Sequence, residues 1–445
     1  MAKQVKPKKP LGDIMKNDRK IHRYLIAFPL IAFLIKMIVM VNLKNGGWYG
    51  ADGENYFAAI DGLLLDGFFS DRQVLNYWPA GYPLLLWPFG IIAPLKILYL
   101  ASFTQSLFFA FSTYFFTRRI LDSKFKSLAF GLAFLISFNP TLSLNSLAIG
   151  YEVPVASCLM MALGYAFKLH SIDSQNFQFR LIASISLWFS LACFMQPRYL
   201  VAAFAVFVFI GWKYVNRNHL ITFASISFVL IMLLPSILIT RNAVSIGKPT
   251  ISTNLGTTMA IGSGQETSGG YDHVGPNVEC KPSKVTDSVS ENDLVLCISL
   301  WYLTNPLKTL KLAFNKSQFY WSPWSGPLVN GTMARNPYLK ISPVQNIRQN
   351  ADGRALVDGG IGKGISAIWI LAQILLLFAG FIFLYRTFAA ERFLIYILFI
   401  PIILGWLVSL ATIGDHRFRI PTMPLSLLFQ YAAFLLLRKR ISKAI

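Results

Sequence analysis

Charged residues are scarce in this chain: they make up 14% of its 445 residues, and only 20 residues are acidic. Four cysteines and five histidines leave little material for a metal cluster, and no CxxC pair occurs. Apolar residues make up 55% of the chain and fall in long runs. This composition excludes a soluble cytosolic enzyme, a disordered chain and a collagen-like repeat, and it predicts a protein with several membrane spans.

Ten apolar runs predict the spans, and the fifth and sixth of them are short. They cover residues 24–42, 96–117, 127–145, 153–168, 181–195, 199–212, 220–240, 366–385, 393–412 and 421–437. The sequence therefore predicts an all-α polytopic membrane protein with about ten transmembrane helices. The runs form one bundle over 24–240 and a C-terminal group of helices over 366–437.

The net charge of +21 would suggest nucleic acid in a soluble protein, but its distribution points elsewhere. With both termini in the cytoplasm, the cytoplasmic segments hold 22 basic and 5 acidic residues, and the outer segments hold 18 and 15. This asymmetry follows the positive-inside rule. We interpret 1–23 as a basic cytoplasmic tail before a retained anchor and 438–445 as a second basic tail, and we expect no nucleic-acid partner.

Two segments between spans are long enough to carry chemistry: residues 42–95 and residues 241–365. In the first, a surface helix is predicted by apolar residues at steps of three and four, with Gly67 as its terminator. The predicted face begins with Asp52, while Glu54 points elsewhere. A helix N-cap is the alternative role for Asp52. The face consists of Asp52, Tyr56, Ala59, Ile60, Leu63, Leu64 and Phe68.

The second long segment, 241–365, has three features of interest. Residues 241–271 are rich in Gly, Ser and Thr and suit a polar lid or binding loop. Residues 305–324 place apolar residues and lysines at helical spacing, which predicts an interfacial helix carrying Lys308, Lys311 and Lys316. A membrane anchor without catalytic role is the alternative. Cys280 and Cys297 would form a disulfide if this loop faces an oxidising compartment.

Charges at the borders of apolar runs are costly and need a reason. Glu152 begins the fourth run, Arg198 lies between the fifth and sixth, and Arg417 and Arg419 lie between the ninth and tenth. All lie on the predicted side of Asp52, so a compact bundle would gather them around one cavity. In an extended turn, Arg417 and Arg419 would share one side, and paired guanidinium groups suit a phosphate. Snorkelling of the arginines to lipid head groups is the alternative.

Seven segments in order resemble the GT-C superfamily of membrane glycosyltransferases. The likeness is to bacterial family 39 members that are similar to dolichyl-phosphate-mannose-protein mannosyltransferases. It covers about residues 24–437. The segments are DGENYFAAIDGLLLDGFF, PAGYPLLL, NPTLSLNSLAIGYEVP, QPRYL, RNAVSIG with STNLGTTMAIGSG, NPLKTLKLAFNKSQFYW and HRFRIPTMP.

The resemblance implies a GT-C-like fold with a periplasmic active site and Asp52 as catalytic base. Many relatives have an acidic residue directly after this aspartate, so Glu54 is a second candidate. The implied reaction transfers a sugar from a polyprenyl-phosphate donor to a protein, lipid or glycan hydroxyl, with inversion. Arg198, Arg417 and Arg419 would bind the donor phosphate, and Tyr56 and His416 would orient the acceptor. Glu152 would either orient the acceptor or pair with an arginine.

Neither a GxGxxG nor a DxD motif occurs, so no nucleotide or fixed metal site is expected, although a divalent metal stays open. A bacterial plasma-membrane location with surrounding lipids as partners follows from the spans. The main alternative is a transporter or lipid flippase, because ten spans with internal prolines also suit alternating access. Against it, no internal repeat of the spans is visible, and the acidic residues concentrate outside the membrane.

Overall fold

The computed structural model describes all residues except 1–10, 43–45, 47–51, 173–177, 265–266, 271–277, 281–289, 323–359 and 445. Every predicted apolar run lies in helix, and the described part of the chain has no β-strand, so the prediction of an all-α polytopic membrane protein is confirmed. The helices of the bundle are α1 (Leu11–Asn42), α5 (Ile97–Leu121), α6 (Lys126–Phe138), α7 (Pro140–Leu144), α8 (Glu152–Ser171), α9 (Phe179–Met195), α10 (Tyr199–Tyr214), α11 (Leu220–Ile246), α18 (Gly360–Thr387), α19 (Arg392–Ala411) and α20 (Met423–Ala444).

The number of helices that qualify as spans depends on the short ones. Within the described residues, seven helices are long and apolar enough to cross a membrane, and a bent pair adds an eighth. That pair joins α6 to α7 and the short 3₁₀ helix η2 (Asn145–Leu147) with a bend of 53°. The bend occurs where Pro140 starts a new helix that Asn139 caps, accepting from the amide of Leu142 at 2.8 Å. The predicted number of about ten is reached only by adding α9 and α10, of 17 and 16 residues.

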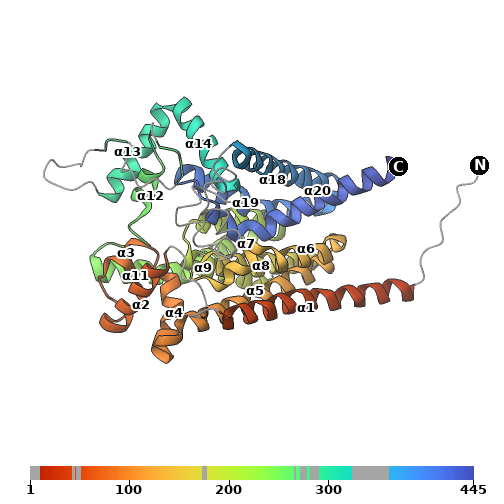
Figure 1. The fold of residues 1–445 in the computed structure, drawn as a ribbon, viewed down its shortest axis with the longest axis horizontal. Helices are drawn as coiled ribbons and strands as arrows, with labels where there is room; N and C mark the ends of the chain where they lie inside the picture. Colours follow the sequence, from red (N-terminus) through yellow and green to blue (C-terminus); the bar gives the residue numbers. More distant parts are fainter. Residues whose placement is uncertain are drawn as a thin grey trace, which may run out of the picture.

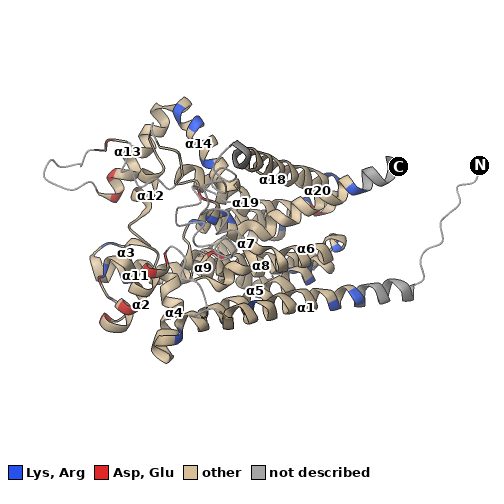
Figure 2. Cartoon of the chain, viewed as in Figure 1, with Lys and Arg blue, Asp and Glu red and all other residues tan. Residues whose placement is uncertain are grey.

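The bundle has two chemically different ends. Helix α1 begins and α20 ends at one end, and the helices of the two long connecting segments gather at the other, which we call the loop end (Figure 1). Figure 2 shows acidic residues mainly at the loop end, whereas basic residues occur at both ends. This distribution agrees with the charge asymmetry found in the sequence.

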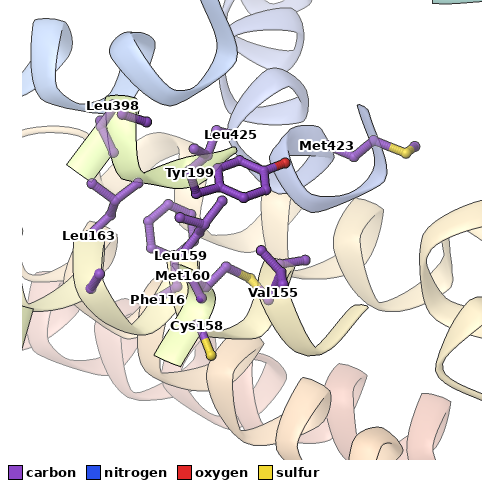
Figure 3. Packing of buried hydrophobic residues seen from close by; sticks show 14 of the residues in the cluster. Phe116, Val155, Cys158, Leu159, Met160, Leu163, Tyr199, Leu398, Met423 and Leu425 are labelled. Carbon is purple, nitrogen blue, oxygen red and sulfur yellow. The ribbon is translucent and has the colours of Figure 1, made fainter. Parts of the chain in front are cut away.

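Helix α8 is the centre of the core and is buried over most of its surface. It packs against α5 and α9, and Figure 3 shows Cys158, Leu159 and Met160 among side chains from other helices. Small residues such as Ala156, Ser157 and Ala162 line α8 and let the neighbouring helices approach closely. Because the first residue of α8 is Glu152, this rigid helix carries a carboxylate to the loop end.

The first long segment folds into α2 (Gly53–Asp66), α3 (Gln73–Tyr77) and α4 (Gly81–Ile92), followed by the 3₁₀ helix η1 (Pro94–Lys96). The predicted helix face is largely confirmed, because Tyr56, Ala59, Ile60 and Leu63 are buried. Leu64 is an exception with a half-exposed side chain. Gly67 ends α2 with φ of +80°, a conformation that favours glycine. The buried face packs against α4, which fixes the start of α2 at the loop end.

The second long segment is more structured than the predicted lid. It contains α12 (Leu255–Ile261), α13 (Glu291–Thr304) and α14 (Pro306–Trp321). Glu291 joins the first two, because its carboxylate accepts from the amide of Gly256 at 2.5 Å and the hydroxyl of Thr257 at 2.8 Å. Cys280 and Cys297 are disulfide-bonded, with their Cα atoms 5.9 Å apart, which settles the pairing that the sequence left open.

Candidate active site

A cavity of about 1130 Å³ lies at the loop end and brings together segments that are far apart in the sequence. Its walls come from the start of α2, the α9–α10 turn, the stretch between α11 and α12, the start of α13 and the turn after α19. The polar and aromatic residues that line it include Asp52, Tyr56, Tyr77, Trp78, Tyr151, Arg198, Lys248, Asn254, Glu291, Arg417 and Phe418. A volume of this order suits a ligand larger than a single small molecule.

Asp52 enters the cavity from the residue before α2. Its side chain makes no capping hydrogen bond to the helix, and its carboxylate Oδ2 instead accepts from Nη1 of Arg417 at 2.8 Å. Both side chains are nearly buried, with 12% and 13% exposure. Asp52 thus occupies the N-cap position of α2 without capping it through its side chain, and its carboxylate pairs with a guanidinium 365 positions away.

Arg417 bridges two carboxylates. Besides Asp52, its Nε lies 3.9 Å from Oε1 of Glu152. Asp415 holds the backbone of this turn, accepting at Oδ1 from the amide of Arg417 at 3.0 Å. Burial, with a smaller contribution from the nearby carboxylates of Glu152 and Asp52, raises the pKa of Asp415 to about 7. The turn thus places the Arg417 guanidinium between the carboxylates of Asp52 and Glu152.

Arg198 supplies a second guanidinium from the tight turn between α9 and α10. Its Cζ lies 3.5 Å from the centre of the Phe418 ring, and the Cζ of Arg417 lies 5.0 Å from the same ring. The Nε and Nη1 atoms of Arg198 are buried and have no hydrogen-bond partner in the described chain. Two cations therefore flank one aromatic ring at the cavity wall, and part of the Arg198 guanidinium is desolvated without a compensating hydrogen bond from the described chain.

Two tyrosines, Tyr82 and Tyr151, lie near Glu152. The hydroxyl of Tyr82 accepts from the amide of Gly150 and from Nε2 of Gln105, both at 2.9 Å. The Glu152 carboxylate folds back over Gly150, so a side chain at position 150 would displace this carboxylate. Tyr151 lines the cavity; burial raises the pKa of this phenol to about 12.

Four residues singled out from the sequence do not line the cavity: Glu54, Glu152, Arg419 and His416. Glu152 lies behind the lining residue Arg417, with its Oε1 3.9 Å from Nε of that arginine. Glu54 is exposed in the first turn of α2, as its helix phase predicts. The turn that carries Arg417 is the 3₁₀ helix η6 (His416–Thr422), so the condition of an extended turn, under which Arg417 and Arg419 share one side, is not met. Arg419 is buried and donates to the carbonyl of Trp321 at 3.3 Å, and His416 is fully buried.

Arg241, at the loop end of α11, is a key residue whose role the sequence did not reveal. It is fully buried, and its guanidinium donates to the carbonyls of Phe68 at 2.9 Å, Leu75 at 3.0 Å and Ser70. It also donates to the side-chain oxygens of Asn76 and Asn242, each at 2.7 Å. The signal in the sequence was an arginine at the end of an apolar run, in RNAVSIG, the same signal that singled out Arg198.

Asn242, the residue after Arg241, connects α11 to the segment that forms one wall of the cavity. The side-chain amide of Asn242 donates to the carbonyls of Thr250 at 2.8 Å and Ile251 at 3.2 Å, and the amide of Thr253 donates to the carbonyl of Asn76 at 3.0 Å. Thr250, Ile251 and Thr253 line the cavity. The pair Arg241 and Asn242 therefore joins the two long segments that form the site.

Lys316 corrects the prediction for the α14 lysines. Lys308 and Lys311 are exposed, but Lys316 is fully buried. Its ammonium donates to the carbonyls of Thr412 at 2.7 Å and Leu410 at 2.9 Å, and to the Tyr302 hydroxyl at 3.0 Å. These carbonyls end α19, where a cation is favourable. Burial lowers the pKa of Lys316 to about 7.

No group of three or more His, Cys, Asp or Glu side chains with metal-binding geometry occurs among the residues that the structure describes. The two carboxylates that line the cavity are already engaged: Asp52 pairs with Arg417, and Glu291 accepts from Gly256 and Thr257. The site thus offers a base and cation donors from its own side chains.

No protein-family model and no curated protein matches the sequence. The apo oligosaccharyltransferase of Archaeoglobus fulgidus is similar with a TM-score of 0.48 at 15% identity, over 94% of this chain and 52% of that chain. The structure of that organism's oligosaccharyltransferase AglB with an inhibitory peptide and a dolichol-phosphate gives a TM-score of 0.45 at 16% identity, over 94% and 52%. The chain thus spans about half the length of these structures, and its activity has to be argued from its own site.

Proposed function

We propose that this protein is an inverting glycosyltransferase that moves a sugar from a polyprenyl-phosphate donor to an acceptor hydroxyl. The proposal rests on one observation: the Asp52 carboxylate is held at 2.8 Å by Arg417 in a cavity that is also lined by Arg198, whose buried Nε and Nη1 have no hydrogen-bond partner in the described chain. Glycosyl transfer from a lipid phosphate needs a base for the acceptor and cations for the departing phosphate. These groups meet here.

The reaction balances with Asp52 as the base. The acceptor oxygen forms a bond to the anomeric carbon while its proton passes to the Asp52 carboxylate. The bond from the anomeric carbon to the phosphate oxygen breaks, and its electron pair leaves with the polyprenyl phosphate. Attack opposite the leaving group inverts the anomeric configuration. Asp52 then returns its proton to water.

Arg198 and Arg417 have different roles at the donor phosphate. Arg198 offers Nε and Nη1 to the phosphate oxygens, and Arg417 lies across the same Phe418 ring. A phosphate that attracts the Arg417 guanidinium loosens the contact of Arg417 with Asp52 and frees that carboxylate to meet the acceptor hydroxyl. Glu152 keeps Arg417 oriented. In this proposal Arg419 and His416 support the turn.

The acceptor is a hydroxyl on a protein, lipid or glycan that reaches the loop end. Tyr77 and Trp78 line the cavity and offer ring faces to a sugar. We propose that the loop end faces the periplasm or exterior of a bacterial plasma membrane and that both termini are cytoplasmic. The charge distribution along the chain supports this orientation.

The test compares two neighbouring carboxylates. Cells that lack the protein are complemented with wild type, Asp52→Asn or Glu54→Gln, and mass spectrometry follows envelope glycans and polyprenyl-phosphate sugars. We expect Asp52→Asn to lower transfer by about a hundredfold or more and to accumulate the donor. Glu54→Gln is the matched control, since its exposed carboxylate lies outside the cavity. Normal glycans with Asp52→Asn at equal membrane levels, or a loss confined to Glu54→Gln, would reject Asp52 as the base.

An assay in detergent, where no membrane compartments exist, distinguishes an enzyme from a transporter or flippase. In detergent no gradient or second leaflet exists, so consumption of a lipid-linked sugar by the purified protein requires chemistry. Movement of the lipid-linked sugar across sealed vesicles with no sugar transferred would instead support a flippase and count against the enzyme.

A further inference from the structure

The hairpin of α13 and α14 has an unusual surface, because its exposed side carries a row of large apolar side chains. Six large apolar side chains form a row along the two helices, with exposures between 51% and 82%. They recur at steps of three and four residues, so they share one face of each helix. We call this the apolar row; it consists of Leu296, Leu300, Leu303, Leu307, Leu310 and Phe314.

The packed side of α14 explains why the row faces away from the protein. Leu312, Lys316 and Tyr320 follow at steps of four and are buried. Lys316 fixes this side by donating to two carbonyls at the end of α19. At 100° per residue, Phe314 lies about 160° from Lys316 around the helix, so anchoring of the lysine directs the apolar row outward.

The position of the α13–α14 hairpin relative to the candidate membrane spans indicates which surroundings the apolar row meets. Helix α14 contacts α18 and α19, and Figure 1 shows it beside the loop end of α18, which is a candidate membrane span. The end of α14 therefore lies beside the first turns of a candidate span, where the hydroxyl oxygens of Ser322 and Ser366 are 3.4 Å apart. Lys308 and Lys311 are exposed on α14 beside the row, as the basic flank of an interfacial helix is.

We propose that the α13–α14 hairpin inserts its apolar row into the leaflet of the membrane at the loop end, with Lys308 and Lys311 against anionic head groups. An apolar surface this continuous on a membrane protein marks an interaction site, and the two lysines complement phosphate rather than a neutral protein surface. Ser290 and Val295, near the start of α13, line the cavity, so this contact ties one cavity wall to the lipid surface. The inference does not depend on the proposed reaction.

The experiment measures where the row lies. Nitroxide labels are attached to single cysteines at Leu300, Leu310 or Phe314 in protein whose buried Cys158 and Cys193 are replaced by alanine, reconstituted in nanodiscs. Power saturation then compares collision with oxygen, which concentrates in lipid, and with a water-soluble nickel chelate. Val208→Cys on α10, at a side chain 70% exposed in an apolar helix, gives the lipid reference, and Asp71→Cys gives the water reference.

We expect the three row positions to match Val208 and a label at Lys308 to show clearly greater nickel access. The combined variant Lys308→Glu and Lys311→Glu should reduce oxygen access at residue 310 in anionic nanodiscs and leave it unchanged in neutral ones. Row labels that match Asp71 would overturn the proposal. So would labels shielded from both reagents, which would indicate cover by protein, or labels that broaden one another, which would indicate a second copy of the chain.

Discussion

Arg198 and Asp415 are the residues whose chemistry can be tested most directly at the scale of single side chains. Arg198 holds buried N–H groups without partners at a cavity wall, and Asp415 is a buried carboxyl close to Asp52 and Glu152. Such arrangements cost free energy in the empty protein, because polar groups are desolvated without full compensation. They are therefore where binding and pH should have the largest effects.

The fork of Arg198 should matter more than its charge. Arg198→Lys keeps the cation but loses the planar pair of donors, so we expect the KM for the lipid-phosphate donor to rise roughly tenfold with a smaller change in kcat. Donor saturation kinetics in detergent measure this. Arg180→Lys, an exposed change at the opposite end of the bundle, is the control and should leave both constants unchanged. An unchanged donor KM in Arg198→Lys would contradict a phosphate role.

Asp415 predicts a pH dependence of stability with a definite sign. Its pKa rises from 3.8 in the unfolded chain to about 7 in the fold, so the neutral carboxyl stabilises the fold below about pH 4. This stabilisation is lost as the pH rises through 7, because ionisation places a further anion near Glu152 and Asp52. The cost is on the order of a few kcal/mol.

Thermal melts in detergent between pH 5 and 7.5 test this. We expect the wild-type melting temperature to fall across this range and that of Asp415→Asn, whose amide oxygen still accepts from the Arg417 backbone, to fall less. Lys316 acts in a different window, since its pKa is lowered from 10.5 to about 7 and it adds stability above pH 7. Equal slopes in the two proteins between pH 5 and 7 would contradict the assignment to Asp415.

At the scale of elements, the walls of the site are turns and helix ends that are held in place by buried hydrogen bonds from charged side chains. The η6 turn is fixed by Asp415, the α2–α3 connection by Arg241, and the end of α19 by Lys316. Two of these anchors are cations that donate to neutral oxygens, and burial makes such bonds costly to remove. Loss of one anchor should therefore loosen a whole wall of the cavity.

Arg241→Lys should destabilise the protein by on the order of 2 to 4 kcal/mol, because one ammonium cannot reach five acceptors and leaves buried oxygens unpaired. Thermal melts in detergent, followed by loss of the monodisperse peak, report this change. Arg118→Lys is the matched control: Arg118 pairs with Asp122 at 3.4 Å with both side chains well exposed, and such a pair contributes little. Similar melting of the two variants would show that Arg241 is not an anchor.

At the scale of the whole molecule, the two ends of the bundle should face different compartments. On intact cells, a membrane-impermeant maleimide should label Asp71→Cys, between α2 and α3, and should label Lys124→Cys, between α5 and α6, only after permeabilisation. Both positions are exposed. Asp71 lies in the segment before α5, at the loop end, and Lys124 comes shortly after the last residue of α5, at the opposite end of the bundle. The reverse labelling pattern would place the cavity in the cytoplasm and rule out the proposed orientation.

Much of this molecule follows from local sequence. Apolar runs of membrane length determine helices whatever their neighbours, because an unpaired backbone is too costly in lipid. The start of α2, its buried face and its end at Gly67 follow from periodicity and one glycine. The site was only partly accessible in this way. Asp52 was identifiable as the start of an apolar helix face and Arg198 and Arg417 as charges at the borders of apolar runs, and these three do line one cavity.

Tertiary structure alone decided which of those charges meet. Arg417 and Arg419 are equivalent by sequence, yet the 3₁₀ turn sends one to Asp52 and the other to Trp321. Lys316 and Lys311 look alike on the helix, yet one is buried under the end of α19 and the other is exposed. The reason is physical: helix formation depends on neighbours along the chain, whereas pairing of a buried charge depends on segments hundreds of residues away, whose approach no local pattern encodes.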